Sequence, residues 1–306
     1  MNQTGSLAIE CQAVTKNYGS GRGVFDLDLG VRRGEVFGFI GQNGAGKTTT
    51  IRLLMDLIRP DHGTIRVAGL DAHRDSLAIK RRVGYLPGEL AQFPGVRAAY
   101  VVGLLAGLRG GVKPERIAAL AKRFDIDLRR KYDELSHGNK QKVALIQAFM
   151  HEPEVLILDE PTLGLDPLMQ REFRTLVRES AAAGATVFLS SHVLSEVEAI
   201  CDRVALIRRG RLLQVGSLGE LRAVRTHQVE ARFSGDVRAE DIASLPGVSG
   251  AAVDDHHITC TVKGSIAPLL KRLEDAGVIE LDSHEMTLEE VFFAQIGEPE
   301  PATADR

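Results

Sequence analysis

Residues Gly41–Thr48, with the sequence GQNGAGKT, combine glycines, a lysine and a hydroxyl in a pattern suited to binding phosphate. Glycines let consecutive backbone N–H groups turn inward around an anion, which side chains at those positions would block. In the pattern G-x-x-x-x-G-K-[ST], Lys47 brings positive charge to the β- and γ-phosphates, and Thr48 offers a hydroxyl to Mg²⁺. The chain is therefore expected to bind a nucleoside triphosphate.

A second candidate site follows the apolar run Val155–Leu158, which ends in the adjacent carboxylates of Asp159 and Glu160. Side chains alternate along a strand, so these two carboxylates are expected to point in different directions. One can hold Mg²⁺ directly or through water, and the other can orient or deprotonate an attacking water. We assign Asp159 to the metal and Glu160 to the water.

The elements around these residues are those that such chemistry needs. The apolar run Val36–Ile40 precedes the phosphate loop as a buried strand, and Thr49–Met55 follows it as a helix whose positive dipole end faces the anion. Strand-like and helix-like segments alternate through the first two thirds of the chain, which predicts a mostly parallel sheet flanked by helices. The expected strands are Val36–Ile40, Val83–Leu86, Val155–Leu158, Thr186–Leu189 and Val204–Ile207, followed by Leu212–Val215.

A third segment, Leu135–Gln141, precedes a helical run and is expected to form a serine-capped helix entrance, which is another anion site. It resembles the LSGGQ signature of ATP-binding cassette (ABC) ATPases, and further motifs follow that family's order over roughly residues 6–225. The resemblance implies an α/β P-loop NTPase of the ABC ATPase type with a helical signature subdomain. The matching motifs are the Walker A loop Gly41–Thr49, the Walker B strand Leu158–Pro161, the D-loop Gly164–Asp166 and the switch histidine in Ser190–His192.

The resemblance also implies a role for each matching residue. In this family two cassettes face each other head to tail, and each ATP lies between one subunit's phosphate loop and the other's signature helix. Tyr18 matches the aromatic residue that stacks on adenine, and His192 matches the residue that senses the γ-phosphate. The expected nucleotide-binding residues are Tyr18, Gly41, Asn43, Gly44, Gly46, Lys47, Thr48, Thr49, Ser136 and Gly138, with Glu160 and His192 catalytic and Thr48 and Asp159 on the metal.

Two places depart from the family pattern. In the signature, His137 replaces a glycine and Asn139 replaces the usual glutamine. Gly88 stands where the family usually has a glutamine that contacts Mg²⁺ or the attacking water. Glu89 could substitute from the next position or be an exposed loop acid, and both interpretations stay open.

Residues 226–297 differ in character, and their strand and helix patterns predict a small accessory α+β domain with an antiparallel sheet. Asp254–His257 could suggest a metal site, but adjacent strand residues point apart, so a solvated hairpin turn is favoured. Thr287–Phe292 resembles the C-terminal extension of bacterial drug-resistance ABC ATPases, and the tail 298–306 is expected to be disordered. The expected elements are strands His227–Phe233, Ile258–Val262 and Val278–Leu281 and helices Ala239–Leu245 and Ile266–Ala276.

Composition limits the possible partners. The net charge of −3 and the pI near 6.3 argue against nucleic-acid binding, which requires a basic stripe. The three cysteines are scattered, which favours a reduced, cytoplasmic setting. Apolar runs fall short of the ~18 residues that a membrane span needs, so work at a membrane would require a partner.

The resemblance implies an ATP-binding and ATP-hydrolysing subunit that drives a separate transmembrane permease, with drugs, antibiotics or lipophilic substrates as the exported class. The expected partners are that permease and a second ABC ATPase subunit, as a homodimer or with a paired homologue, at the cytoplasmic face of the cell membrane. Two alternatives remain: a soluble ABC ATPase acting on ribosomes or DNA, and a low-turnover ATP-binding regulator. The apolar helix expected at Ala98–Leu108 is either buried core or partly a docking patch for the permease.

Overall fold

The computed structural model describes residues 7–219, 226–235 and 237–285. The chain divides into two compact units, residues 1–218 and 219–306, and each has its own core. Among the described residues, no helix is both long and apolar enough to cross a bilayer. The segment Thr287–Phe292 and the tail 298–306 lie outside the described residues.

A six-stranded sheet with the strand order β10-β9-β3-β8-β7-β6 forms the centre of the first unit. Five strands run parallel, and the edge strand β10 is antiparallel to β9. All of β3 and β7 is buried, which is why β3 and the run Val155–Leu158 of β7 are continuously apolar. The predicted mostly parallel sheet is confirmed, with β3 at Val36–Ile40, β6 at Val83–Leu86, β7 at Val155–Asp159, β8 at Thr186–Ser191, β9 at Arg203–Arg208 and β10 at Arg211–Ser217.

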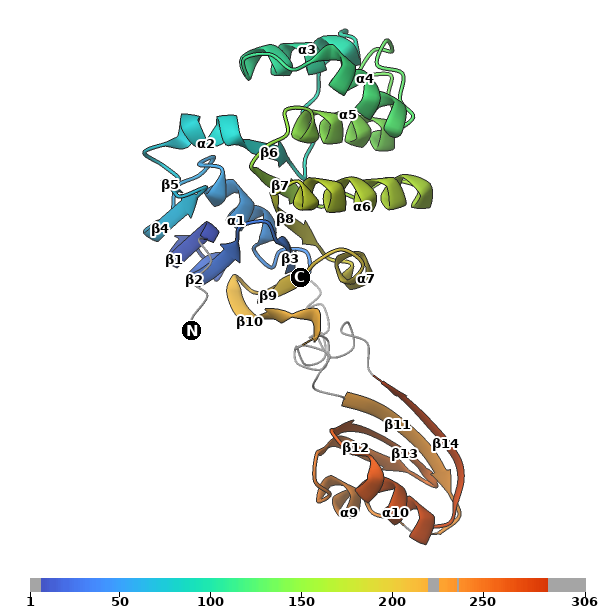
Figure 1. Cartoon of the computed structure of the whole chain (residues 1–306). Coiled ribbons are helices and arrows are strands. Elements are labelled where there is room, and N and C mark those ends of the chain that lie inside the picture. Colours follow the sequence, from blue (N-terminus) through green and yellow to red (C-terminus); the bar gives the residue numbers. More distant parts are fainter. Residues whose placement is uncertain (1–6, 220–225, 236, 286–306) are drawn as a thin grey trace, which may run out of the picture. The chain divides into compact units, whose positions relative to one another are not determined.

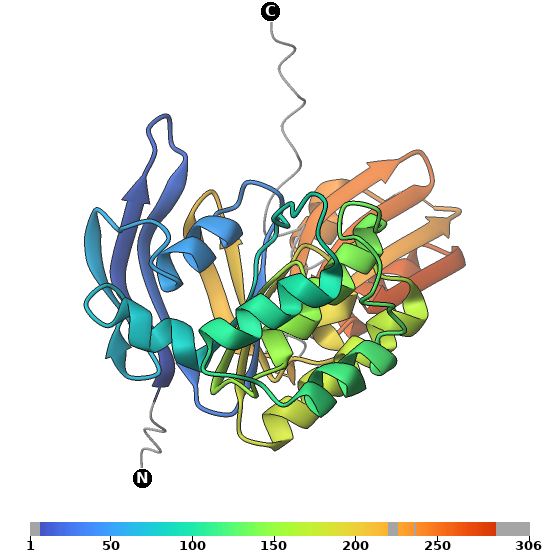
Figure 2. The ribbon, with the colours of Figure 1, turned by 90° about the horizontal axis from the view of Figure 1, so that it is seen from above.

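A second, antiparallel sheet with the order β2-β1-β4-β5 is absent from the sequence prediction. Its central strand β1 pairs with both β2 and β4, and the register shifts between Cys11 and Val14. Such irregularities break the alternation by which a strand is recognised. The blue hairpin β1–β2 stands clear of the teal and green helices in Figure 2. The strands are β1 at Leu7–Asn17, β2 at Gly23–Arg32, β4 at His62–Val67 and β5 at Leu70–Asp71.

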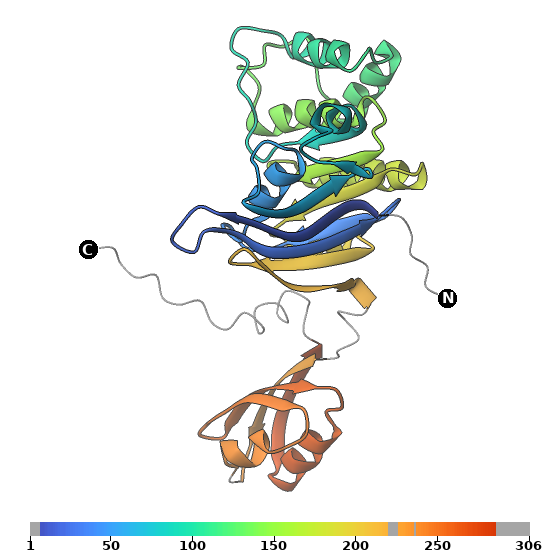
Figure 3. The same ribbon diagram turned by 90° about the vertical axis from the view of Figure 1, so that its left-hand side faces the viewer.

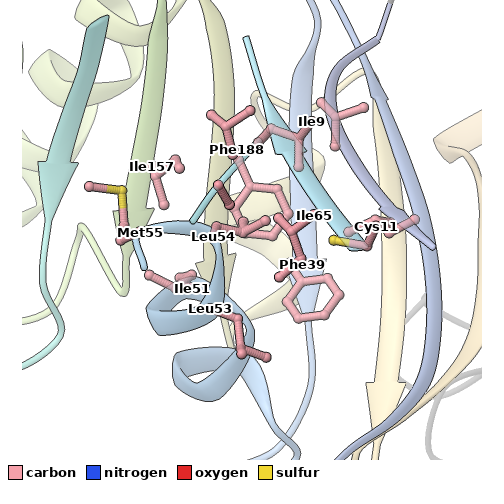
Figure 4. Close-up of a cluster of buried hydrophobic side chains, with 14 of the residues drawn as sticks. Ile9, Cys11, Phe39, Ile51, Leu53, Leu54, Met55, Ile65, Ile157 and Phe188 are labelled. Carbon is pink, nitrogen blue, oxygen red and sulfur yellow. The ribbon is translucent and has the colours of Figure 1, made fainter. Parts of the chain in front are cut away.

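Helix α1 (Lys47–Leu54) lies between these two sheets and begins at the phosphate loop (Figure 1). Its apolar side chains join one buried cluster that both sheets share. Burying one Leu or Ile side chain contributes about 1.5–3 kcal/mol to the stability of the folded state. This cluster therefore fixes the position at which α1 begins. Figure 4 shows Ile51, Leu53, Leu54 and Met55 of this segment among Ile9, Cys11 and Ile65 from one sheet and Phe39, Ile157 and Phe188 from the other.

The remaining helices of the first unit cover the parallel sheet and its β6 edge. Helix α6 (Pro167–Ala182) packs against β8 and β3. Helix α5 (His137–Phe149) packs against β6, and α3 (Ala98–Leu108) and α4 (Pro114–Arg123) pack on α5 (Figures 1 and 3). These three helices form the helical subdomain that the resemblance implies. The described part of the unit also contains two short helices, α2 at Ser76–Arg82 and α7 at Leu194–Glu198.

The described residues of the second unit have the chain order β-α-β-β-α-β. The four strands among them are antiparallel in the order β12-β13-β11-β14, which is the ferredoxin-like arrangement. Helices α9 and α10 contribute Ile242, Leu269 and Leu273 to the core. The elements are β11 at Thr226–Phe233, α9 at Ala239–Ala243, β12 at Val248–Asp254, β13 at His257–Lys263, α10 at Ala267–Asp275 and β14 at Val278–Glu285.

The acidic and histidine-rich segment of this unit is a tight turn. Asp254 pairs with His257 across the β12–β13 hairpin, and Asp255 has a left-handed backbone with φ of 53°. The His256 ring packs edge-on against Phe233, with 6.0 Å between ring centroids. The predicted hairpin turn is therefore confirmed.

Candidate nucleotide-binding site

A cleft of about 600 Å³ opens over the phosphate loop. Residues from the loop, from the β1–β2 turn and from the end of β7 line it together. A triphosphate with its base fits a cavity of this size. The lining residues are Tyr18, Arg22, Gly23, Gln42, Asn43, Gly44, Gly46, Lys47, Thr48, Thr49 and Glu160.

The phosphate loop requires glycine at several positions. A Cβ on Gly41 would lie 2.5 Å from the carbonyl oxygen of Ile207 on β9, so the loop passes too close to that strand for a side chain. Gly44 and Gly46 have φ of 79° and 113°, which side chains disfavour. Gly46 is the N-cap of α1 and has no capping side chain, so the first N–H groups of α1 stay available to an anion.

The Lys47 ammonium is held inside the loop. Its Nζ donates to the carbonyl oxygens of Gly41, at 2.6 Å, and Gln42, at 3.3 Å, and lies 3.2 Å from Glu160 Oε1. The side chain is only 6% exposed. A buried ammonium with these anionic partners is already placed where a phosphate oxygen can replace the Glu160 carboxylate.

Asp159 is buried and only half of its carboxylate is satisfied. Oδ1 accepts a hydrogen bond from Ser190 Oγ at 2.6 Å, whereas Oδ2 is buried without a partner. Gly88 faces this oxygen, since a Cβ there would lie 2.9 Å from it. An unpaired buried carboxylate oxygen is costly, and a hard divalent cation would satisfy it. With the Thr48 hydroxyl in the adjoining cleft, these donors fit Mg²⁺.

Glu160 has a left-handed backbone, with φ of 48°, and its carboxylate contacts both Lys47 and His192. Oε2 lies 2.8 Å from His192 Nδ1, and Oε1 faces Lys47. The Glu160 N–H donates to Ser190 Oγ at 3.0 Å. The two carboxylates thus have different partners, as predicted, but the cause is the left-handed backbone of Glu160 after the end of β7 and not alternation along a strand. Ser190 contacts the Asp159 carboxylate and the Glu160 N–H.

The structure adds a residue that the sequence analysis gives no role. Gln141 of α5 is buried, and its Nε2 donates to the carbonyl oxygens of Glu160, at 3.3 Å, and Pro161, at 3.1 Å. These bonds tie the signature helix to the backbone of Glu160. The feature of the sequence that could have indicated this role is a polar side chain among the core-facing residues of a helix.

The signature residues lie elsewhere. Ser136 caps α5, because its Oγ accepts from the Asn139 N–H at 3.3 Å. A Cβ on Gly138 would lie 2.4 Å from the carbonyl oxygen of Gly164, so only glycine fits against the D-loop. Neither Ser136 nor Gly138 lines the cleft over the phosphate loop. The chain therefore does not bring its own signature to its own phosphate loop.

Tyr18 and Glu89 differ in their relation to the cleft. Tyr18 lines it with a ring that is 48% exposed, available for stacking. The Glu89 side chain is 91% exposed and lies 3.8 Å from Arg52. It is Gly88, and not Glu89, that approaches Asp159. Glu89 is an exposed loop acid in this structure.

Helix α3 has two distinct faces. Ala98, Val101, Val102 and Ala106 are buried against the rest of the unit. Tyr100, Leu104 and Leu108 form an exposed stripe with a spacing of four residues, and we call these three residues the α3 stripe. The core interpretation is therefore confirmed for the four buried residues, and the exposed α3 stripe leaves a docking role as a proposal.

A phosphate loop between a buried parallel strand and a helix, facing a strand that ends in two carboxylates, defines a P-loop ATPase. Residues 24–163 match the family model for the ABC transporter domain. The daunorubicin resistance ATP-binding protein DrrA3 of Streptomyces coeruleorubidus is 34% identical over 307 residues, which cover 95% of this chain and 96% of that protein. The chain belongs to the ATP-binding proteins of ABC transporters.

Two further similarities define the extent of the match. A solved ATP-binding subunit of an ABC transporter is 31% identical, with a TM-score of 0.67, over 71% of this chain and 92% of that one. The probable multidrug ABC transporter ATP-binding protein YbhF of Escherichia coli is 34% identical over 224 residues, which are 72% of this chain but 39% of YbhF. The solved subunit thus supports the fold of the cassette, and DrrA3 matches nearly the whole chain.

Proposed function

We propose that this chain is the ATP-hydrolysing subunit of a bacterial exporter and that it drives a separately encoded permease. The observation that carries the proposal is that Glu160 lines the nucleotide cleft with Lys47 and contacts both Lys47 and His192. The names of the relatives, one for daunorubicin resistance and one for multidrug transport, support drugs or antibiotics as the exported class.

The contacts of the site suggest how its residues act. When ATP enters, its γ-phosphate competes with the Glu160 carboxylate for Lys47, which leaves that carboxylate free to orient and polarise a water. His192, hydrogen-bonded to Glu160, keeps the carboxylate aimed and contacts the γ-phosphate. Thr48 and Asp159 would hold Mg²⁺, which would neutralise charge on the phosphates. Tyr18 stacks on the adenine.

A second copy of the chain completes the site. Ser136 and Gly138 lie at the amino end of α5, where backbone N–H groups and the Ser136 cap suit an anion, yet they are outside the cleft. In a head-to-tail homodimer each signature meets the ATP on the other subunit. ATP then joins the two subunits, and release of phosphate separates them, which is a two-state motion that a partner can use.

The α3 stripe is the docking surface for the permease at the cytoplasmic face of the membrane. Its three side chains are 62%, 49% and 72% exposed, and they recur on one helix face. Gly103 and Gly107 lie between them with no neighbouring heavy atom around a Cβ position, so a helix can approach the backbone closely. The acidic balance of the chain supports a protein partner over nucleic acid.

The Glu160→Gln variant tests the proposed function. Removing the carboxylate's negative charge should lower ATP turnover at least about 100-fold, because a general base contributes 10² or more. ATP binding remains, so the variant should accumulate as an ATP-bound dimer in size-exclusion chromatography with light scattering. Near-normal hydrolysis would overturn the assignment of Glu160. Wild-type protein that binds ATP without turnover would favour the regulator instead.

A further inference from the structure

A hydrogen bond between the side chains of Glu160 and His192 joins two segments of the chain at the nucleotide site. Glu160 follows β7 and His192 follows β8, so the two residues lie 32 positions apart in the sequence. Their contact, 2.8 Å between Oε2 and Nδ1, requires the ends of these strands to keep one spacing. His192 is exposed, so packing around its ring does not hold that spacing. Other contacts of the two segments must therefore do so.

The side chain of Glu196 links the two segments directly. Glu196 belongs to α7, which packs against β8 (Figure 1). Its Oε2 accepts a hydrogen bond from Thr162 Oγ1 at 2.6 Å and another from Ser191 Oγ at 3.2 Å. Thr162 lies two residues after Glu160, and Ser191 directly precedes His192. One carboxylate oxygen thus connects the segment of Glu160 to the segment of His192.

The hydroxyl of Ser191 has one proton and two acceptors within reach. Its Oγ lies 3.2 Å from both Glu196 Oε2 and the Val193 carbonyl oxygen, and it accepts from the Val193 N–H at 2.9 Å. A carboxylate is the stronger acceptor, so the proton is directed to Glu196. Ser191 then bridges the Glu196 carboxylate and the Val193 N–H, which fixes the backbone on both sides of His192.

Thr162 is held in the turns that follow Glu160. The Glu160 carbonyl oxygen accepts from the Leu163 N–H at 3.2 Å, and the Thr162 carbonyl oxygen accepts from the Leu165 N–H at 3.1 Å. Thr162 itself is buried. Because these turns share their backbone with Glu160, a shift of Thr162 would also move Glu160.

The three linked side chains lie away from the nucleotide. Thr162, Ser191 and Glu196 line a small cavity whose walls include the apolar residues Phe173 and Ile200. A hydrogen bond in such surroundings is electrostatically stronger than in water, and an unpaired polar group is more costly. None of these five residues lines the nucleotide cleft. The hydrogen bonds of Glu196 therefore reach the site through the segments that they join.

We propose that Glu196 is a positioning residue for ATP hydrolysis, which holds Glu160 and His192 at the spacing they need when the γ-phosphate enters. This proposal rests on the roles that the proposed function gives to those two residues. Glu196 also lies in the first turn of α7, where negative charge favours the helix dipole. That effect needs no bond to Thr162, which is 34 residues away, so substitutions of Thr162 separate the two roles.

Thr162→Val tests the proposal, because valine keeps the shape of threonine and leaves the Glu196 charge in place. We expect kcat for ATP hydrolysis to fall about tenfold with ATP affinity unchanged, as the loss of a hydrogen bond to a charged group predicts. The imidazole signals of His192 should shift in NMR, although His192 itself is unchanged. Thr162→Ser retains the hydroxyl and should restore most of the wild-type kcat and the wild-type imidazole signals.

Glu196→Ala should lower kcat at least as much as Thr162→Val. Adding Thr162→Val to Glu196→Ala should lower kcat no further, because both changes remove the same bond. Glu115→Gln is the matched control, since Glu115 is also an acid in the first turn of a helix, α4, and lies outside the nucleotide cleft. Its kcat and the His192 signals should equal those of the wild type.

The outcomes separate this inference from the proposed function. Normal kcat in Thr162→Val, even with lower thermal stability, would show a merely structural bond and would overturn the inference. Equal losses in Thr162→Val and Glu115→Gln, or losses that multiply in the double variant, would also overturn it. If Glu160→Gln abolishes turnover while Thr162→Val is normal, this inference alone fails. Near-normal hydrolysis by Glu160→Gln would overturn the role of Glu160 and this inference together.

Discussion

At the scale of single residues, the position of Glu160 depends on partners far away in sequence. Its left-handed backbone is a conformation that costs non-glycine residues about 1–3 kcal/mol, and it persists where the surroundings hold it. Ser190 receives the Glu160 N–H, and Gln141 donates to the Glu160 carbonyl oxygen. The backbone conformation of Glu160 therefore sets the direction of its carboxylate, and hydrogen bonds to β8 and α5 hold that conformation.

Replacing Gln141 tests this arrangement. Gln141→Leu keeps the volume but removes both hydrogen bonds, each worth about 0.5–1.5 kcal/mol. We expect kcat for ATP hydrolysis to fall about tenfold while ATP affinity stays unchanged, since a loss of about 1.4 kcal/mol is tenfold in rate.

The control is Gln12→Leu on the antiparallel sheet, where the exposed amide bonds to Glu10 and Thr64, outside the nucleotide cleft. This variant should match the wild type in both quantities. A Gln141→Leu protein with normal kcat, or one whose loss of activity follows a loss of thermal stability, would show that Gln141 does not position Glu160.

At the scale of elements, the sequence identifies what a short buried run or a local motif defines. Strands β3 and β7 are found because all of their residues are buried and all are apolar except Asp159, which ends β7. Strand β1 is not predicted from the sequence because its pairing with β2 and β4 shifts register. Those shifts depend on the neighbouring strands, which a short stretch of sequence does not contain. The roles of Ser190 and Gln141 are not predicted for the same reason. Their shared partner, Glu160, lies 30 and 19 residues away in the sequence.

The α3 stripe makes a prediction at this scale. Leu104→Glu places a charge at its centre, where the side chain is 49% exposed, so the fold should be unaffected. We expect the purified chain to keep its basal ATPase rate. Recovery of the variant with cell membranes should fall several-fold relative to the wild type, because a buried unpaired charge opposes docking. Leu77→Glu, at a 69% exposed leucine on α2, is the matched control.

His151, at the junction of α3, β6 and α5, makes the stability of the fold depend on pH. Burial and Arg109 lower the pKa of His151 from 6.5 to about 4. Between these values the unfolded chain binds the extra proton, so the free energy of unfolding decreases as the pH falls. Allowing for partial exposure, the loss from pH 7 to pH 5 should be about 1 kcal/mol. Urea unfolding should show this loss in the wild type and less of it in His151→Gln; equal losses would contradict it.

At the scale of the whole molecule, the proposed division of the site between two copies predicts complementation. Lys47→Ala disables the phosphate loop and leaves the signature intact, whereas Ser136→Glu does the reverse by placing negative charge against the phosphates. Each homodimer should be inactive. Half of randomly mixed dimers contain one variant of each kind, and each of these has one intact site of two, so activity should return to about a quarter of the wild-type rate. Mixing Lys47→Ala with a Lys47→Ala, Ser136→Glu double variant is the control, because that pair creates no intact site. An ATPase assay of the mixtures that stays at background would contradict a site shared between two subunits.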